Sequence, residues 1–484
     1  MNWAQLNLIP ALPEIFLFAA LSFILLLDLF ISEAKRGWIH ALSLLTLAVC
    51  FVLQYLTWTP QPTLILNRMF IADSLSAVSN LCSYVAMALT LVYSRQYLAD
   101  RKMLCGEYYA LSLFALLGMN VMICANHFLT LYLGLEILSL ALYALVALKR
   151  DSPTASEAAM KYFVLSALAS GLLLYGISML YGATMSLNIS AIPHITHLGV
   201  ANQVLLVLGL VFLVAGLCFK LGAVPFHMWL PDVYQGAPTA ITLLVGAAPK
   251  LAALVFFVRI LAQGMSDMLP DWQGMLIIVA VLSMLIGNLS AIVQTNIKRM
   301  LAYSTIAHMG FLLMGFLTGS AEGYAAALYY TILYILMALV AFGILLVLSR
   351  AGFECEQLAD LKGLNQRNSW YAALMLLAMF SMAGIPPLAG FYAKLMVVRA
   401  ALDQHLTALA VFAMLMSLVG AFYYLRIVRL MYFDSAEDKH AIVVRPDVQI
   451  VLSINALALL VLGILPESLL VLCIESMKQS LVLL

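Results

Sequence analysis

Long apolar stretches alternate with short charged, proline-rich or glycine-rich segments along the whole chain. Most of the apolar stretches hold about 20 residues or more, the length that a helix needs to cross a bilayer core about 30 Å thick. Cutting the chain at the polar segments predicts about fourteen membrane spans, and hence an all-α polytopic membrane protein. The predicted spans are 8–31, 38–57, 73–94, 107–124, 127–148, 158–182, 201–232, 238–262, 272–293, 300–318, 322–349, 370–402, 405–432 and 448–474.

Two of these spans contain residues that interrupt a helix. The first, within Gly216–Pro238, contains Pro225, and the second contains the sequence AGIPPLAG at 383–390. Proline lacks an N–H and clashes with the preceding turn, so neither span is one continuous helix. Broken backbone at membrane depth survives only where protein or a water-filled cavity satisfies the freed groups. Each break should therefore hold a cation beside unwound backbone: Lys220 precedes the first break and Lys394 follows the second.

The spacing of the two breaks predicts an internal repeat. They lie five spans apart, and broken helices in corresponding positions of two five-span units are typical of inverted-repeat transporters. Because five is odd, the second unit would be inverted relative to the first. The predicted organisation is a three-helix segment at 1–106, a first repeat at 107–262, a second repeat at 272–432, and a C-terminal loop and last helix at 433–484.

The composition agrees with a membrane protein and excludes other classes. Of 484 residues, 65% are hydrophobic and 10% charged, and the mean hydropathy is +1.04, whereas a soluble domain carries roughly 25% charged residues. The net charge of +1 argues against a nucleic-acid partner. None of the 7 cysteines forms a CxxC motif, no GxGxxG follows a strand pattern, and no phosphate-binding loop is present. We therefore expect no metal, haem, flavin or iron–sulfur site in this chain.

The basic residues predict the orientation in the membrane. With the N-terminus outside, the outer segments contain only Arg68, Arg259, Arg399 and Lys478, so the positive-inside rule places both termini outside. The first apolar run has no basic lead or small-residue cleavage site and reads as a membrane helix. A short N-terminus without a transit peptide favours the bacterial inner membrane. The inner loops then hold Lys35, Arg36, Arg95, Arg101, Lys102, Lys149, Arg150, Lys298, Arg299, Arg350, Lys362, Arg367, Arg429, Lys439 and Arg445.

Glu136 is the most unusual acidic residue, because it lies in the middle of a predicted span. Tyr132, Glu136, Ser139 and Tyr143 form one polar stripe on an otherwise apolar helix. A carboxylate at this depth costs several kcal/mol unless it is paired or protonated. Lys220 is its expected partner, and a pair whose separation changes would switch that lysine between its charged and neutral forms. The alternative is a static ion pair that holds two helices together.

Two further lysines lie within predicted spans. Lys250 follows Pro249 near the middle of span 238–262, where its side chain cannot reach water, so we expect it to carry protons. Lys394 follows the second break and could face an outer half-channel. The alternative for Lys394, as for Lys220, is a side chain that snorkels to the membrane surface.

His308 adds a group that titrates near neutral pH to span 300–318. Ser304 and Thr305 share its face of the helix, and imidazole can relay protons, although a single histidine in a helix is often only a packing residue. Glu136, Lys220, Lys250, His308 and Lys394 thus give one acid and four bases across the middle of the membrane. No catalytic triad, metal cluster or phosphate loop competes with this pattern, which suits proton translocation.

Three charged residues near the inner ends of spans have simpler interpretations. Lys161 and Glu157 have the i, i+4 spacing of an ordinary pair at a helix start, and the alternative is an electrostatic link from this pair to Lys220. Asp232 either caps a helix after the first break or lines an inner water cavity, and the sequence leaves both open.

At these residues the chain resembles the antiporter-like membrane subunits of proton-pumping NADH–quinone oxidoreductase, respiratory complex I. The resemblance covers nearly the full length, and it is closest to the N type, because of VYQGAP at 233–238, Lys394 where another type carries glutamate, and the lack of a long lateral helix. Its motifs are LGLEILSL around Glu136, EAAMKYF around Lys161, GLCFKLGAVPFHMWLPDVYQGAP around Lys220, APKLAAL around Lys250, QTNIKRMLAYSTIAHMG around His308 and AGIPPLAGFYAKL around Lys394.

The resemblance implies roles for residues and partners. Glu136 and Lys220 would form a modulating pair, Lys250 would be the central proton carrier and Lys394 the carrier on the exit side. NADH, FMN, iron–sulfur clusters and quinone would belong to partner subunits, and this chain would contact other membrane subunits, including further antiporter-like ones. Two alternatives remain: a subunit of a related multi-subunit cation/proton antiporter, and a structural scaffold whose charges only lock helices together.

Overall fold

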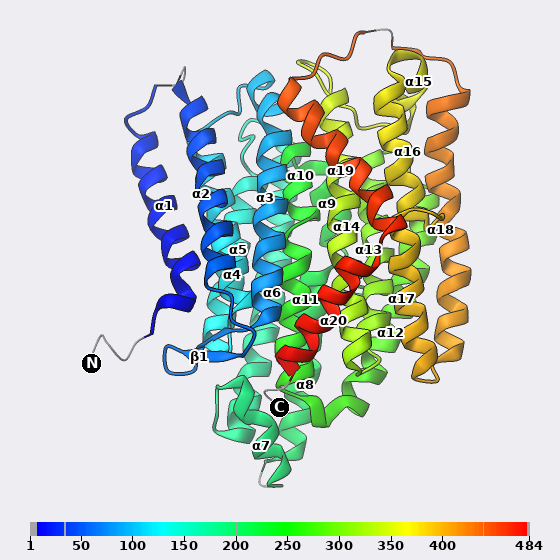
Figure 1. The fold of residues 1–484 in the computed structure, drawn as a ribbon. Coiled ribbons are helices and arrows are strands. Elements are labelled where there is room, and N and C mark those ends of the chain that lie inside the picture. The colour runs from blue at the N-terminus through cyan, green and yellow to red at the C-terminus, as the bar shows by residue number, and fades with distance from the viewer. Residues whose placement is uncertain (1–6, 33–34, 200, 439, 482–484) are drawn as a thin grey trace.

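The computed structural model describes residues 7–32, 35–199, 201–438 and 440–481, and it is mostly helical (Figure 1). Strands β1 (Thr63–Ile65) and β2 (Phe70–Ala72) form an antiparallel hairpin with Leu64 opposite Ile71. The helices are α1 (Leu12–Asp28), α2 (Gly37–Leu56), α3 (Ser74–Asp100), α4 (Gly106–Ile123), α5 (Phe128–Val146), α6 (Pro153–Thr184), α7 (Ile192–His197), α8 (Gln203–Leu221), α9 (Trp229–Gly236), α10 (Thr239–Gly246), α11 (Pro249–Phe257), α12 (Leu269–Ile292), α13 (Ile297–Phe316), α14 (Ala321–Leu348), α15 (Leu364–Arg367), α16 (Ser369–Ala383), α17 (Ala389–Asp403), α18 (Thr407–Phe433), α19 (Pro446–Ile464) and α20 (Glu467–Leu481).

The long helices stand side by side as one bundle, with α1 and α2 at one edge and α16 to α18 at the other (Figure 1). The helices α10, α11 and α14 are buried along nearly their whole length, whereas α1, α2, α18 and α19 leave many of their apolar residues exposed or half-buried. An exposed apolar face is stable in lipid, so the outer helices meet the bilayer and the central ones are shielded from it. The start of α1 and the end of α20 lie at the same end of the bundle as β1 and α7 (Figure 1).

Every predicted span contains helix in the structure. Twelve helices in the described part of the chain are long and apolar enough to cross a membrane, judged by length and composition. The two predicted spans outside that set are α13 and the broken pair α16 and α17. The all-α membrane fold is confirmed, while the inverted relation of the two repeats stays a prediction. Lys439, one of the predicted inner-loop residues, lies outside the described residues.

The last predicted span, 448–474, is wrong as a single helix. The helix α19 ends at Ile464, and α20 begins at Glu467 and runs back across α3 and α14 (Figure 1). Leu465 has φ −119° and ψ 66°, because the residue before a proline is pushed out of the helical region. Pro466 therefore ends this span, and the sequence reading overlooked it.

Both predicted helix breaks are present, and they have the same local geometry. The helix α8 is capped by Gly222 at φ +81° and α16 by Gly384 at φ +86°. In each case the glycine N–H donates to the helix carbonyls three and four residues back, at Cys218 and Phe219 in the first break. A side chain is strained at such positive φ, and a Cβ on Gly222 would also lie 2.4 Å from the Leu230 side chain. Glycine is thus required where each span turns away from the helix.

The span predicted at 238–262 is itself interrupted. Ala247 has φ −108° and ψ −93° between α10 and α11, and Pro249 occupies the first turn of α11, where its missing N–H costs nothing. After α11 the chain continues as a π-helical segment, Val258–Gln263. The helix is therefore interrupted at Ala247, just before Pro249 and Lys250.

Arg259 was expected in an outer segment of the chain, but its side chain lies in the protein interior. Its side chain is fully buried and forms two parallel bonds with Asp73, the N-cap of α3, at 2.7 Å and 2.8 Å. It also donates to the Ile123 carbonyl at 3.2 Å. These hydrogen bonds link the start of α3 and the end of α4 to the π-helical segment Val258–Gln263.

Replacing Asp73 by asparagine is expected to lower the free energy of unfolding by about 3–5 kcal/mol, because it leaves a guanidinium buried without its counter-charge. The measurement is the midpoint of thermal unfolding of the detergent-purified assembly. Asp403→Asn, which removes the partner of the exposed Arg399 at 3.9 Å, serves as the control and should have little effect. Equal stability of the two variants would contradict a structural role for the Arg259–Asp73 pair.

Candidate functional site

Lys250 occupies the first helix break. Its ammonium nitrogen donates to the carbonyl of Leu221, the last residue of α8, at 2.9 Å, and it lies 5.5 Å from the centre of the Trp229 ring. The lysine is 1% exposed. A helix leaves its last carbonyls without intrahelical partners, and the aromatic face adds a favourable contact for a cation. The break therefore provides a site for the ammonium at the centre of the bundle.

Lys394 occupies the second break in the same way. Its ammonium nitrogen donates to the carbonyl of Ala383, the last residue of α16, at 2.9 Å, and lies 5.1 Å from the centre of the Phe311 ring. It donates in addition to the Ser417 hydroxyl at 2.9 Å. Lys250 and Lys394 thus each donate to the carbonyl that precedes a left-handed glycine. The cation in the first break is Lys250 and not Lys220, which corrects the match expected from the sequence.

Lys220 points away from the break, towards hydroxyl groups on neighbouring helices. Its ammonium nitrogen donates to Ser139 of α5 at 2.6 Å and to Ser166 of α6 at 2.9 Å. Glu136 accepts a hydrogen bond of 2.6 Å from Ser170, one turn further along α6. No ion pair within 4 Å joins Glu136 to Lys220, both of which the structure describes. Glu136 and Lys220 therefore each form hydrogen bonds with serine hydroxyls and not with one another. An electrostatic interaction between them acts across these serine side chains.

A small cavity connects Lys220 with Lys250. It has a volume of about 20 Å³, and Ser139 and Trp229 are also among its lining residues. A space of this size holds one water molecule when polar groups line it. The two lysines therefore line one cavity that has room for about one water molecule.

His308 lies between two tyrosines on other helices. Its Nδ1 forms a hydrogen bond of 2.6 Å with the Tyr330 hydroxyl of α14, and its Nε2 one of 2.9 Å with Tyr424 of α18. Tyr424 is bonded in turn to Ser304, one helical turn from the histidine. A second cavity, of about 10 Å³, is lined by His308, Tyr424 and Lys394. The imidazole is thus hydrogen-bonded at both nitrogens and adjoins the second lysine site.

Buried hydroxyl groups lie between the Lys250 and His308 regions. Tyr334 of α14 donates to Thr305 at 2.7 Å, and its ring centre is 5.3 Å from that of His308. The Tyr234 hydroxyl lies beside Gly246, where an added Cβ would be 2.9 Å away. These groups extend the line of polar side chains from the first lysine site to the second.

At one end of this line, Asp232 joins three helices. It accepts from Lys161 of α6 at 2.9 Å and from Arg299 of α13 at 2.8 Å, and Lys161 also pairs with Glu157 at 2.8 Å. The helix-start pair of Lys161 and Glu157 is confirmed. Asp232 lines a cavity of about 420 Å³, which agrees with the cavity-lining interpretation, while the opening of this cavity on the inner side stays a prediction.

Lys250, His308 and Lys394 are buried in the bundle interior, whereas Lys220, which shares a small cavity with Lys250, and Glu136 on α5 are half-buried. The sequence reading missed their partners. Ser166 and Ser170 could have been found, because they form an i, i+4 pair of hydroxyls on an apolar helix. Tyr330, Tyr424 and Ser417 could not, because they come from other helices and only the packing of the bundle shows which side chains meet.

The chain is similar to known proteins over nearly its whole length. The family described as "NADH:quinone oxidoreductase/Mrp antiporter, TM" matches residues 125–420. A protein of Laribacter hongkongensis named NADH-quinone oxidoreductase subunit N is 59% identical over 483 residues, 99% of both chains. A chain of "Respiratory complex I from Thermus thermophilus with bound Aureothin" superposes with a TM-score of 0.82 at 32% identity, covering 95% of this chain and 98% of that one. A chain of the Mrp complex from Dietzia sp. DQ12-45-1b shares the fold, with a TM-score of 0.84 at 20% identity over 98% of this chain and 97% of that one.

Proposed function

The chain belongs to the NADH-quinone oxidoreductase subunit N family, and from this premise we propose how its buried residues conduct protons. It is a membrane subunit of a proton-translocating NADH-quinone oxidoreductase and works beside other antiporter-like membrane subunits. The resemblance based on the sequence motifs is confirmed. We place NADH, FMN, the iron–sulfur clusters and quinone in partner subunits, and this chain in the bacterial inner membrane with both termini outside.

The observation that carries the proposal is the shared site of Lys250 and Lys394. Each ammonium donates to a carbonyl freed by a helix break, and each lies beside a cavity of about one water. An ammonium group can release its proton, whereas a guanidinium cannot. When the proton leaves, the charge-assisted hydrogen bond to the helix carbonyl becomes a weaker one from a neutral amine, so the protonation state and the local backbone are coupled. Lysines in these positions suit proton transfer better than static helix locking.

The proposed route runs along the line of polar groups. Protons pass between Lys220 and Lys250 through the first small cavity, and then along buried hydroxyls to His308. The histidine passes them to Lys394 through the second cavity, and Ser417 lies on the exit side. The charge of Glu136 acts on Lys220 across the serine layer and sets when its proton is released. We propose that the units 107–262 and 272–432 each supply one lysine site, while 1–106 and 433–484 support them.

Replacing Lys394 by methionine is expected to reduce NADH-driven proton pumping by about a hundredfold or more, the low end of the loss when a proton-transfer group is removed. The measurement is acidification of the lumen of inverted membrane vesicles, normalised to the amount of assembled complex. Arg399→Met, on the exposed face of the same helix, is the matched control and should pump normally. Equal pumping by the two variants would contradict the role of Lys394. Cation/proton antiport by the purified chain alone would instead favour the antiporter alternative.

A further inference from the structure

Lys298 is a buried lysine that the sequence reading placed in an inner loop. It is the second residue of α13, and it is 1% exposed, whereas the side chain of its neighbour Arg299 is 30% exposed. A cation is disfavoured in the first turn of a helix, because the helix dipole is positive there. A residue that only oriented the protein in the membrane would point into water. Specific partners must therefore hold Lys298 in the interior.

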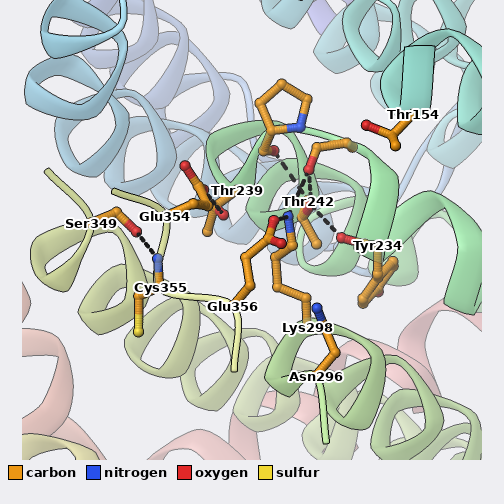
Figure 2. Close-up of polar contacts among 12 residues, drawn as sticks. Thr154, Tyr234, Thr239, Thr242, Asn296, Lys298, Ser349, Glu354, Cys355 and Glu356 are labelled. Carbon is orange, nitrogen blue, oxygen red and sulfur yellow. Dashed lines mark hydrogen bonds and ion pairs between the residues drawn. The ribbon is translucent and has the colours of Figure 1, made fainter. Parts of the chain in front are cut away.

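Those partners come from two other segments. The Lys298 ammonium donates to the carbonyl of Ala237 at 3.0 Å and pairs with Glu356 at 2.8 Å. Figure 2 shows Lys298 extending from α13 to the junction of α9 and α10, with Glu356 beside it. The segment that carries Glu356 is fixed in place, because the Ile297 N–H donates to the Glu356 carbonyl at 2.7 Å.

The contact with Ala237 repeats the pattern of the two proposed proton carriers. Ala237 is the C-cap of α9 and has an extended backbone before Pro238, so its carbonyl lies at a helix break. Lys250 donates to Leu221 and Lys394 to Ala383 in the same manner. Lys298 is thus a third buried lysine that donates to the last carbonyl before a helix break.

Lys298 differs from the other two in its access to water. It lines the cavity of about 420 Å³, which has room for many water molecules, together with Glu354, Glu356, Asp232 and Lys161. The Glu354 carboxylate accepts hydrogen bonds from Tyr97 and Arg101. Burial would raise the pKa of Glu354, but the hydrogen bond from Thr239 and the charges of Lys298 and Arg101 hold that pKa below its usual value. The cavity therefore keeps an anionic wall beside Lys298.

The helix α10 connects this cavity to Lys250. The Thr242 hydroxyl donates to the carbonyls of Tyr234 at 3.1 Å and of Ala237 at 3.4 Å (Figure 2). The Tyr234 side chain reaches from α9 to Gly246, at the junction that precedes Lys250. Thr242 thus donates to the same Ala237 carbonyl as Lys298, and the Tyr234 hydroxyl lies beside Gly246, near the junction of α10 and α11.

We propose that Lys298 is a proton-accepting residue that takes protons from the water of the 420 Å³ cavity and passes them by way of Thr242 and Tyr234 to Lys250. The inference rests on the proposed function and adds the uptake step to it. Neutral Lys298 accepts one proton from cavity water, pairs as an ammonium with Glu356, and returns to the neutral amine when the proton moves on to Lys250.

The test uses the complete complex in inverted membrane vesicles, with NADH-driven pumping normalised to assembled complex. Lys298→Arg keeps the charge and both contacts but cannot release a proton, so pumping should fall by about a hundredfold. Lys298→His restores a group that titrates near neutral pH, and it should pump better than the arginine variant, most clearly at acidic pH. The matched control is Lys362→Arg, at an exposed lysine that pairs with Glu437.

A purely structural Lys298–Glu356 pair predicts the opposite order. Arginine would then replace lysine without loss and histidine would be the poorer substitute, and that result overturns the inference. A parallel Lys250→Met variant tests the proposed function separately from the uptake step. Loss of pumping in Lys250→Met with normal pumping in Lys298→Arg rejects the uptake step alone. Normal pumping in Lys250→Met rejects the proposed function itself.

Discussion

Lys250→Met is expected to abolish NADH-driven proton pumping, with a loss of about a hundredfold or more, while the complex still assembles. Methionine has a similar length and suits a buried site, but it has no proton to transfer. It leaves the Leu221 carbonyl without the donor that now lies at 2.9 Å, which costs about 1–3 kcal/mol. That cost is small beside the packing of the fully buried α10 and α11, so assembly should persist. Vesicle acidification per assembled complex is the measurement.

Two further variants show whether the loss of pumping comes from the missing proton or from the missing charge. Lys250→Arg should pump nearly as poorly as the methionine variant, because guanidinium keeps its proton. Lys362→Met removes an exposed lysine at its pair with Glu437 and should leave pumping unchanged. Pumping by Lys250→Arg at the normal rate would mean that only a positive charge is needed at the break, as the scaffold alternative requires.

Glu136→Gln is expected to lower pumping by about tenfold, with normal assembly. Glutamine can still accept the hydrogen bond that Ser170 now donates at 2.6 Å, so the packing of α5 on α6 is retained. What is lost is the negative charge that acts on Lys220 across Ser139 and Ser166. The same vesicle assay applies, and pumping at the normal rate would remove the modulating role of Glu136.

The control for this variant is Asp403→Asn, at an exposed carboxylate that pairs with Arg399 at 3.9 Å. Exposed i, i+4 pairs contribute little, so this variant should pump like the native complex. A similar loss in both variants would point to general charge effects rather than to the Glu136 site.

The sequence predicted the spans and the breaks because both depend on local chemistry. Apolar length predicts helices in lipid, and proline beside glycine predicts where Gly222 and Gly384 end them. The five titratable residues were found for the same reason, because a charge is conspicuous within an apolar span. Pro466 was a local signal too, and it was missed because the apolar pattern continues on both sides of it.

The partners of these residues depend on helix packing, which the sequence does not display. Spacing could not reveal that Lys250 enters the first break while Lys220 turns to two serines. Arg259 and Lys298 follow the pattern of basic residues near span ends, yet both are buried, because an acidic partner from a distant segment meets each of them. A positive-inside count treats such residues as surface charges and cannot recognise buried ion pairs.

The most direct test of the central claim is the number of protons translocated per NADH oxidised in proteoliposomes. The native complex and the Lys250→Arg complex are compared at equal NADH oxidation rates, with the native enzyme slowed by limiting NADH. If protons cross this chain through the lysines at its helix breaks, the ratio falls in the variant. An unchanged ratio at matched turnover would mean that protons do not pass through Lys250, and it would contradict the account.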